Sequence, residues 1–388
     1  MNYIILQNAD NINSYFLSAH STKGLYQQMK NYKVGIIGAT GMVGQRFVSL
    51  LAEHPWFDIA VLAASARSAG KAYEEAVAGR WAFDWPIPEH VKGMTVVDAA
   101  DVKAVTSAVD FVFCAVDMKK DEIRALEDAY AKTETPVVSN NSAHRGTPDV
   151  PMIIPELNPE HAEVIEYQRK RLGTKTGFVT VKPNCSIQSY VPALTALLDL
   201  KPTRVVVSTY QAISGAGKTF KRWPEMVDNV IPYIGGEEEK SEQEPLKIWG
   251  RIEGGVIVPA KAPIISAHCV RVAVADGHLA TCWASFERPA SREEIIERWR
   301  SFEGLPQKLN LPSAPHPFLQ YFDEDNRPQT RLDRDFEHGM GVSLGRLRGD
   351  SLFDWRFVGL SHNTLRGAAG GAVLIAELLC AQGYIPKK

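Results

Sequence analysis

Apolar positions in the first half of the chain follow two alternating patterns. Short apolar runs, typical of buried parallel strands, lie at residues 34–37, 59–64, 111–116 and 136–139. Between them, apolar residues recur at helical spacing over residues 42–52 and 122–131. Strands that alternate with helices indicate a doubly wound parallel sheet, so the pattern predicts an α/β domain of the Rossmann type.

The second half has longer strand-like segments with fewer helices between them. These segments cover residues 205–211, 264–275, 278–286, 342–348 and 355–360. They predict an α+β unit whose mixed or antiparallel sheet has helices on one face. Residues 363–380 predict one closing helix, and residues 235–244 are interpreted as a charged loop. Residues 1–28 show no sustained period and predict a loose extension.

Composition and charge narrow the classes of function. The 388 residues carry 43 Lys and Arg against 45 Asp and Glu, which leaves no electrostatic footprint for nucleic acid or an anionic membrane. No apolar run reaches the roughly 18 residues of a membrane-spanning helix. Five scattered cysteines without a C-x-x-C pair argue against a disulfide framework and a cysteine zinc site. A soluble cytoplasmic protein without metal, nucleic-acid or membrane partners is therefore expected.

A glycine-rich turn, residues 38–44, follows the first predicted strand and opens a helix. Glycines in such a turn let the backbone approach a pyrophosphate at the helix N-terminus. The predicted cofactor contacts are Gly38, Thr40, Gly41, Met42, Val43 and Gly44. Because the spacing is G-x-x-G-x-x-G rather than G-x-G-x-x-G, an ordinary glycine-rich turn is the alternative interpretation.

The end of the next strand favours NADP over NAD. An NAD site usually has an acid here to bind the ribose hydroxyls, but residues 65–68 read Ser-Ala-Arg-Ser. The hydroxyl groups of Ser65 and Ser68 and the guanidinium of Arg67 suit a 2′-phosphate. The alternative is that Arg67 is a solvated surface residue.

Cys185 lies where an apolar strand passes into a segment that looks helical. A thiol at a helix N-terminus has a lowered pKa and more thiolate, so Cys185 is a candidate nucleophile. The four other cysteines have apolar neighbours and are expected in the core. Spacing alone leaves the nucleophile and an inert thiol equally open. Pro192 must begin or kink the assumed helix.

Several short motifs occur together in one order. They are Gly-Ala-Thr-Gly at 38–41, Ser-Ala-Arg-Ser at 65–68, Pro-Asn-Cys-Ser at 183–186, Ser-Gly-Ala-Gly at 214–217, and the segment 363–371. From Lys33 to its C-terminus the chain resembles the aspartate-β-semialdehyde dehydrogenase family, in particular its fungal and archaeal branch. The resemblance implies NADPH-dependent reduction of L-aspartyl 4-phosphate to the 4-semialdehyde with release of phosphate, through a cysteine thioester. Such an enzyme serves the biosynthesis of lysine, threonine and methionine.

The resemblance also implies a fold like that of glyceraldehyde-3-phosphate dehydrogenase. We expect an N-terminal extension over residues 1–32 and an NADP-binding domain over 33–184 that is completed by a C-terminal helix, 362–388. A catalytic and oligomerisation domain would cover 185–361. The long sheet of that domain suggests a homodimer or homotetramer that buries the outer face of the sheet.

Individual roles follow from the same resemblance. Cys185 corresponds to the nucleophile, and His278, seven residues after Arg271, to its acid/base partner, whereas His268 is interpreted as structural. The implied substrate contacts are Arg271 for the α-carboxylate, Glu244 for the amino group, Lys247 for the phosphate, Gln211 near the thiol, and Asn141 with Arg145 as a second anion-binding cluster. The implied nicotinamide-side contacts are Ser214, Gly215 and Asn363.

Rival functions also have some support. Residues 212–219, Ala-Ile-Ser-Gly-Ala-Gly-Lys-Thr, imitate the phosphate-binding loop of an NTPase, although Pro224 would disturb the helix that such a loop requires. A reductase of malonyl-CoA or a related acyl-CoA would share the fold and the thiol chemistry. Its substrate lacks an amino group and has no need of Glu244. A non-catalytic binding module is a further alternative.

Overall fold

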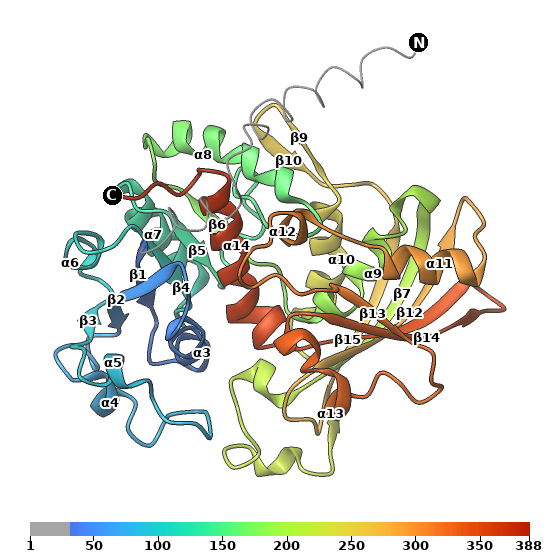
Figure 1. Cartoon of the computed structure of the whole chain (residues 1–388), viewed down its shortest axis with the longest axis horizontal. Coiled ribbons are helices and arrows are strands. Elements are labelled where there is room, and N and C mark those ends of the chain that lie inside the picture. Colours follow the sequence, from blue (N-terminus) through green and yellow to red (C-terminus); the bar gives the residue numbers. More distant parts are fainter. Residues whose placement is uncertain (1–31) are drawn as a thin grey trace.

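The structure, a computed structural model, describes residues 32–388. Two β-sheets lie side by side, and the C-terminal helix α14 (Gly370–Ala381) runs between them (Figure 1). The predicted N-terminal extension lies outside the described residues except for Tyr32, with which the first strand begins.

The first sheet has six parallel strands in the order β3-β2-β1-β4-β5-β6, which confirms the predicted Rossmann-type architecture. Its strands are β1 (Tyr32–Ile37), β2 (Phe57–Ala64), β3 (Val97–Asp98), β4 (Phe111–Cys114), β5 (Val137–Ser139) and β6 (Val179–Val181). The accompanying helices are α3 (Met42–Leu51), α4 (Tyr73–Ala76), α5 (Glu89–Lys92), α6 (Val102–Thr106), α7 (Lys120–Lys132) and α8 (Ile165–Leu172), the last preceded by the 3-10 turn η1 (Pro159–Val164). The strand order reverses between β1 and β4, where sheets of this type bind ligands.

The second sheet has seven strands in the order β13-β14-β15-β12-β7-β11-β8 and mixes parallel with antiparallel pairs, as predicted. Its strands are β7 (Pro202–Gln211), β8 (Val230–Ile231), β11 (Ile264–Val272), β12 (His278–Phe286), β13 (Leu319–Phe322), β14 (Val342–Gly349) and β15 (Trp355–Ser361). A separate hairpin consists of β9 (Arg251–Glu253) and β10 (Val256–Val258). The helices of this half are α9 (Val191–Thr195), α10 (Glu237–Ile248), α11 (Arg292–Arg300), α12 (Leu305–Lys308) and α13 (Thr330–Asp333).

The prediction of a charged loop over residues 235–244 is wrong, because these residues begin helix α10. Three glutamates in its first turn stabilise the positive end of the helix dipole. Its buried face carries Glu237, Ser241 and Glu244, spaced at helical intervals, where most helices have apolar residues. Because this face is polar, hydrophobic periodicity could not reveal the helix.

The predicted single helix over residues 363–380 is broken. A π-helical turn, η7 (Leu365–Ala369), contains Ala368 with φ −142° and ψ −110°, and α14 begins only at Gly370. From Gly370 to Cys380 every residue of α14 is buried, so the helix has no solvent face. Residues of α14 share one hydrophobic core with β1, β2 and β4 of the first sheet.

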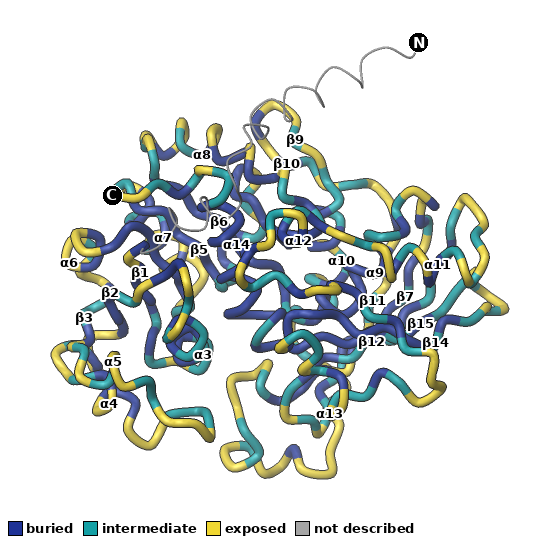
Figure 2. Tube along the Cα trace, viewed as in Figure 1, coloured by how far each residue is buried: buried dark blue, intermediate teal, exposed yellow. Residues whose placement is uncertain are grey.

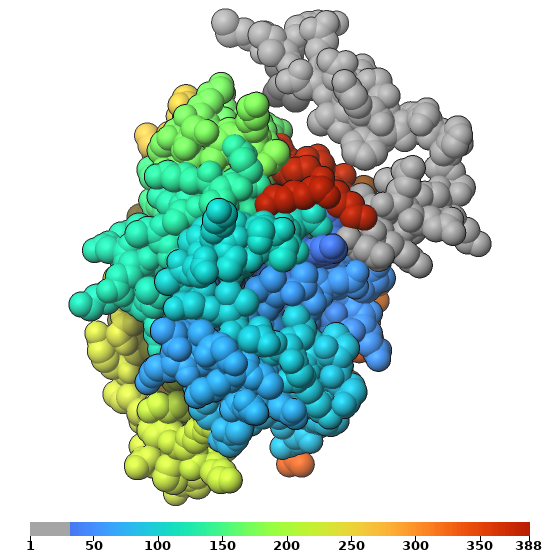
Figure 3. Space-filling view, turned by 90° about the vertical axis from the view of Figure 1, so that its left-hand side faces the viewer, coloured from blue at the N-terminus to red at the C-terminus, as the bar shows by residue number. Residues whose placement is uncertain are grey.

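Burial follows this architecture. Strands β1, β4, β5 and β6 of the first sheet are buried for most of their length, whereas β7, β11 and β12 of the second sheet alternate between buried and less buried residues (Figure 2). The last residues of the chain lie on the surface of the first half (Figure 3), where the Lys388 amide donates to Asp110 at 2.7 Å. Within residues 32–388, no helix is long and apolar enough to cross a membrane.

Candidate active site

The glycine turn after β1 is sterically fixed. Gly38 has φ +88°, and a Cβ there would lie 2.3 Å from the Ala115 carbonyl oxygen. A Cβ on Gly44 would lie 2.1 Å from the Gly38 oxygen, so helix α3 packs closely on the turn. A Cβ on Gly41 meets only the Gly38 oxygen, at 3.5 Å. Gly41 therefore faces open space, which is what the approach of a pyrophosphate requires.

A cleft of about 480 Å³ opens at this turn. It is lined by Gly38, Thr40, Gly41, Ala64, Ser65, Arg67, Ser68, Lys71, Arg80, Ala99, Ala115, Val116, Asp117 and Met118. The structure thus brings together six of the predicted cofactor contacts and adds two cations, Lys71 and Arg80, that sequence reasoning missed. Arg67 is exposed and has no hydrogen bond or ion pair among residues 32–388, so its guanidinium is free to bind an anion.

Met42 and Ser214 line a second, smaller cavity of about 140 Å³ between α3 and the loop after β7. Asn363 borders this region. Its Oδ1 accepts from the Gly277 amide at 2.8 Å, and its Nδ2 donates to Ser214 Oγ at 2.8 Å. These bonds tie the C-terminal segment to both loops. Val43 and Gly44, in α3, line neither cavity.

The loop after β7 is not a P-loop. Residues 213–216 form a 3-10 turn, and no α-helix occurs among the described residues between 212 and 236. A P-loop requires a helix N-terminus directly after its Lys-Thr pair, so the NTPase alternative is wrong.

Cys185 lies in the loop after β6 and precedes the 3-10 turn η2 (Ser186–Ser189). Asn184 fixes this turn, since its Oδ1 accepts from the Ser186 amide at 2.7 Å. The predicted lowering of the thiol pKa is not found. Burial, and next the negative charge of Glu237, raise the pKa of Cys185, and a 3-10 turn of four residues offers little helix dipole in return. Pro192 begins α9, one of the two alternatives left open.

His278, the first residue of β12, faces the thiol. Its Nε2 lies 3.4 Å from Cys185 Sγ, and its Nδ1 accepts from the Ala212 amide at 3.0 Å. Burial, and next the charge of Arg271, lower the pKa of His278 to about 3, so the ring is neutral near pH 7. His268 is exposed on β11, and its interpretation as a structural residue stays a prediction.

Arg271 lies beside His278, and both side chains pack against Gly215 in the loop after β7. A Cβ on Gly215 would lie 2.8 Å from Arg271 Nη1 and 3.1 Å from His278 Nε2. Any side chain at residue 215 would therefore displace this pair. Arg271 Nη1 donates to the Ala212 carbonyl at 2.7 Å, which leaves most of its guanidinium for another acceptor.

Glu237 connects the thiol loop with the second sheet, and sequence reasoning missed it. Its carboxylate accepts from Asn184 Nδ2 at 3.0 Å and from Gln211 Nε2 at 3.2 Å, and it pairs with Lys240 at 2.7 Å. Gln211 is therefore linked to the thiol loop through Glu237, and its role near the thiol stays a prediction. The sequence signal that could have identified Glu237 is its position in an acidic run, Glu237 to Glu239, at the start of a helix.

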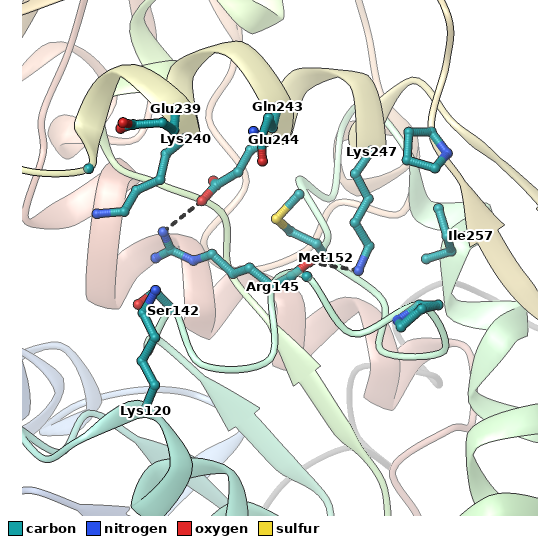
Figure 4. A pocket seen from close by; sticks show the side chains of 14 residues that line it. Lys120, Ser142, Arg145, Met152, Glu239, Lys240, Gln243, Glu244, Lys247 and Ile257 are labelled. Carbon is teal, nitrogen blue, oxygen red and sulfur yellow. Dashed lines mark hydrogen bonds and ion pairs between the residues drawn. The ribbon is translucent and has the colours of Figure 1, made fainter.

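Glu244 and Arg145 form an ion pair in the wall of a cavity of about 540 Å³ (Figure 4). Arg145 Nη1 donates to Glu244 Oε1 at 3.0 Å, while Glu244 Oε2 accepts from the Asn184 amide at 2.5 Å. Glu244 therefore links this cavity to the loop that carries Cys185. Lys120, Ser142 and Lys240 line the same cavity and add further groups that can bind an anion.

Two residues predicted to bind anions are engaged elsewhere. Lys247 Nζ donates to the carbonyl oxygens of Arg145, Thr147 and Val150 at 2.8, 2.8 and 2.9 Å. All three hydrogens of its ammonium are thereby used, so Lys247 stabilises this loop and has no donor left for phosphate. Asn141 Nδ2 donates to the buried Glu127 at 3.0 Å.

Comparisons with known proteins identify relatives of this chain. Residues 33–165 match the family model "Semialdehyde dehydrogenase, NAD binding domain", and residues 194–366 match "Semialdehyde dehydrogenase, dimerisation domain". Aspartate-semialdehyde dehydrogenase of Methanothermobacter thermautotrophicus is 45% identical over 89% of this chain and 98% of its own. The enzyme of Aspergillus fumigatus is 41% identical over 91% of this chain and 98% of its own.

Solved structures show the same relationship. Aspartate semialdehyde dehydrogenase with NADP from Candida albicans is 39% identical, with a TM-score of 0.83 over 91% of this chain and 99% of that chain. The Vibrio cholerae enzyme II complexed with ASA is 25% identical, with a TM-score of 0.69 over 91% of this chain and 99% of that chain. The chain therefore belongs to the aspartate-semialdehyde dehydrogenase family.

Proposed function

We propose that the protein catalyses the reversible, NADPH-dependent reduction of L-aspartyl 4-phosphate to L-aspartate 4-semialdehyde with release of phosphate. The observation that carries the proposal is the contact between Cys185 Sγ and His278 Nε2, at 3.4 Å, with Arg271 beside it. A thiol, a ring N–H and a carboxylate-binding cation are the groups that acyl transfer from an amino-acid substrate requires.

In the first half-reaction, Cys185 Sγ attacks the acyl phosphate carbon, phosphate leaves and a thioester forms. Arg271 binds the α-carboxylate, and support for this role is that its guanidinium lies beside His278 and that the residue is only 6% exposed. Arg145 and the cations of the adjoining cavity supply donors for the phosphate. Glu244 lies in the same cavity wall, contacts the thiol loop through the Asn184 amide, and is the carboxylate assigned to the substrate amino group.

Bound NADPH supplies the hydride that reduces the thioester. The residues around the glycine turn fit this cofactor, since Gly41 leaves room for a pyrophosphate and Arg67, Lys71 and Arg80 line the same cleft. In the second half-reaction, His278 holds its Nε2–H toward the sulfur. From there it can donate to the oxygen that becomes negative beside Cys185.

A homo-oligomer is supported by the match to a dimerisation domain. On the outer face of the second sheet, Val270, Tyr210 and Leu279 form one row across β11, β7 and β12. Such a partly apolar row fits a subunit interface, and the choice between dimer and tetramer stays a prediction. A cytoplasmic location and a role in lysine, threonine and methionine biosynthesis also stay predictions.

The decisive experiment is a phosphate-dependent NADP reduction assay with aspartate semialdehyde. NADPH oxidation with malonyl-CoA is measured in parallel. We expect turnover in the first assay only. Turnover with malonyl-CoA alone would replace the proposed function by acyl-CoA reduction.

Replacement of Arg67 by Ala should weaken NADPH binding by about 10- to 100-fold and bring NADPH and NADH affinities closer together. The physical reason is the loss of a charge-assisted hydrogen bond to the 2′-phosphate, which NADH lacks. Titration of both cofactors by fluorescence measures the effect. Equal affinities of the variant and the native protein for NADPH would make Arg67 a surface residue only.

Glu244→Gln tests recognition of the substrate amino group. Gln keeps the size and most hydrogen-bonding capacity of the side chain but removes its charge. We expect kcat/KM for aspartate semialdehyde to fall by about 10- to 100-fold, as for a lost charge-assisted contact in a partly dry site. Succinic semialdehyde, which has no amino group, should be a poor substrate of the native enzyme and should respond little to the change.

The comparison of two substrates isolates one contact, as a double-mutant cycle does. It matters because Glu244 also holds Arg145 and the Asn184 amide. Equal losses with both substrates would assign Glu244 to that internal network, and the acyl-CoA alternative would gain weight.

A further inference from the structure

Glu237 holds two amide side chains that belong to different parts of the site. Its Oε1 and Oε2 each accept from Asn184 Nδ2 at 3.0 Å, and Oε2 also accepts from Gln211 Nε2 at 3.2 Å. Asn184 lies in the loop after β6, directly before Cys185, whereas Gln211 is the last residue of β7. One carboxylate, on a residue that is 8% exposed, therefore joins the loop of the nucleophile to the second sheet.

Each of the two amides is one residue away from a group that contacts the imidazole. Gln211 is followed by Ala212, whose amide donates to His278 Nδ1 at 3.0 Å. Asn184 is followed by Cys185, whose Sγ lies 3.4 Å from His278 Nε2. The carboxylate that binds both amides thus lies between the segment that carries the thiol and the segment that anchors the ring of its partner.

A carboxylate can hold both amides in one orientation only. When ionised it accepts hydrogen bonds and donates none, so the NH₂ end of each amide must face it. With the two ends exchanged, a carbonyl oxygen would lie against a negative charge. Asn184 Oδ1 is thereby left to accept from the Ser186 amide at 2.7 Å, which fixes the turn after the thiol. Gln211 Nε2 donates in addition to Thr209 Oγ1 at 3.2 Å, so both of its hydrogens are used.

Several contacts keep Glu237 ionised. Burial alone would raise its pKa, but the charge and hydrogen bond of Lys240, together with the hydrogen bonds of the two amides, lower it. Lys240 Nζ lies 2.7 Å from Oε1. Glu237 is also the first residue of α10, where the positive end of the helix dipole favours a carboxylate. Near pH 7 the side chain is therefore charged and can only accept.

We propose that Glu237 is a positioning residue of the active site. Its charge fixes the amides of Asn184 and Gln211. These amides in turn maintain the approach of Cys185 Sγ to His278 Nε2, its acid/base partner. Glu237 itself has no hydrogen bond with either of these two residues. The inference rests on the proposed function for the reaction that it supports, whereas the contacts of the carboxylate exist without substrate.

Glu237→Gln tests the role of the charge, because it keeps the shape of the side chain but replaces one acceptor oxygen by an NH₂ donor. This donor would face Asn184 Nδ2, Gln211 Nε2 or the Lys240 ammonium, which are donors themselves, so at least one of them must move. We expect kcat with aspartate semialdehyde to fall by about 10- to 100-fold, since a displacement of about 1 Å at reacting atoms has an effect of this size. KM should change by less than about threefold, because the variant removes no substrate contact.

Alkylation by iodoacetamide, without substrate or cofactor, gives a second readout of opposite sign. Burial, and next the negative charge of Glu237, raise the pKa of Cys185. In Glu237→Gln the alkylation rate of Cys185 at pH 8, taken as the difference from Cys185→Ala, should therefore rise by about twofold or more. Unfolding would instead expose the four other cysteines, which are buried, so their alkylation reports loss of structure. A more reactive thiol in a slower enzyme indicates displaced partners rather than a damaged nucleophile.

Glu238→Gln is the matched control, because it removes the same charge from the same turn of α10. Glu238 accepts from the Cys269 amide at 3.2 Å and contacts neither of the two amide side chains. Its kcat and the alkylation rate of Cys185 should both remain close to native. Glu237→Asp keeps the charge on a side chain that is one carbon shorter, and it should recover part of the kcat that Glu237→Gln loses.

An unchanged kcat in folded Glu237→Gln would overturn the proposal, and so would an equal loss of kcat in Glu238→Gln. If Glu237→Gln does not give a cooperative thermal transition, Glu237→Asp takes its place, with a lowered kcat and a native alkylation rate expected. Absence of semialdehyde turnover in the native protein would refute the proposed function alone. Alkylation of Cys185 would then decide, since a faster rate in Glu237→Gln than in Glu238→Gln supports the positioning role and equal rates refute it.

Discussion

Replacement of Cys185 by Ala should abolish turnover of aspartate semialdehyde, by at least about 10⁴-fold, because no other group in the site can form the thioester. NADPH affinity should stay within about twofold of the native value. The cleft beside the glycine turn is lined by residues of the first half, and Cys185 is not among them. Steady-state kinetics and fluorescence titration of the cofactor measure the two quantities on one preparation.

Cys282→Ala is the matched control for this variant. Cys282 is buried in β12 and lies outside the site. Its replacement by Ala also removes one buried thiol. Its activity should remain close to native. Residual turnover above about 1% in Cys185→Ala would refute the thiol mechanism, whereas inactivity of both variants would point to damage to the second sheet.

The Rossmann-type half could be predicted from sequence because its signals are local. Strands β1, β2, β4 and β5 contain short apolar runs, whereas the two-residue β3 has none and was not predicted. The turn after β1 needs Gly38 and Gly44 for steric reasons that hold with or without a ligand. The cofactor cleft follows from that geometry, since the carboxyl ends of parallel strands meet at one edge. Lys71 and Arg80 were missed because they reach the cleft from a loop and a turn with no recognisable motif.

The reactive centre could be predicted only in part. Cys185 and His278 are 93 residues apart in sequence, and only the fold brings them to 3.4 Å. The charge state of the thiol depends on burial and on Glu237, Lys182 and Arg145 together, so the expectation from a local helix N-terminus had the wrong sign. Helix α10 was missed for a related reason, because its buried face holds the polar groups of the site.

The C-terminal segment is held near this centre by a buried ion pair. Arg366 Nη1 donates to Glu156 Oε1 at 2.7 Å, and the two side chains are 1% and 0% exposed. Arg366 also donates to Gln188, in the turn that follows Cys185, and its guanidinium lies 4.6 Å from the ring centre of Phe318. The next residue, Gly367, packs on Cys185. This ion pair therefore couples the C-terminal segment to the thiol loop.

Glu156→Gln should lower the free energy of unfolding by about 3–5 kcal/mol, measured by urea denaturation. The variant leaves the Arg366 guanidinium buried without a counter-charge. The desolvation cost of this buried charge remains, and attraction to a carboxylate no longer offsets it. The double variant Glu156→Met, Arg366→Met removes both charges and keeps apolar volume. Its loss should therefore be well below the sum for Glu156→Gln and Arg366→Met. A loss of unfolding free energy below about 1 kcal/mol in Glu156→Gln would mean that water or a rearranged side chain replaces the carboxylate. The coupling between the C-terminal segment and the thiol loop would then come from apolar packing alone.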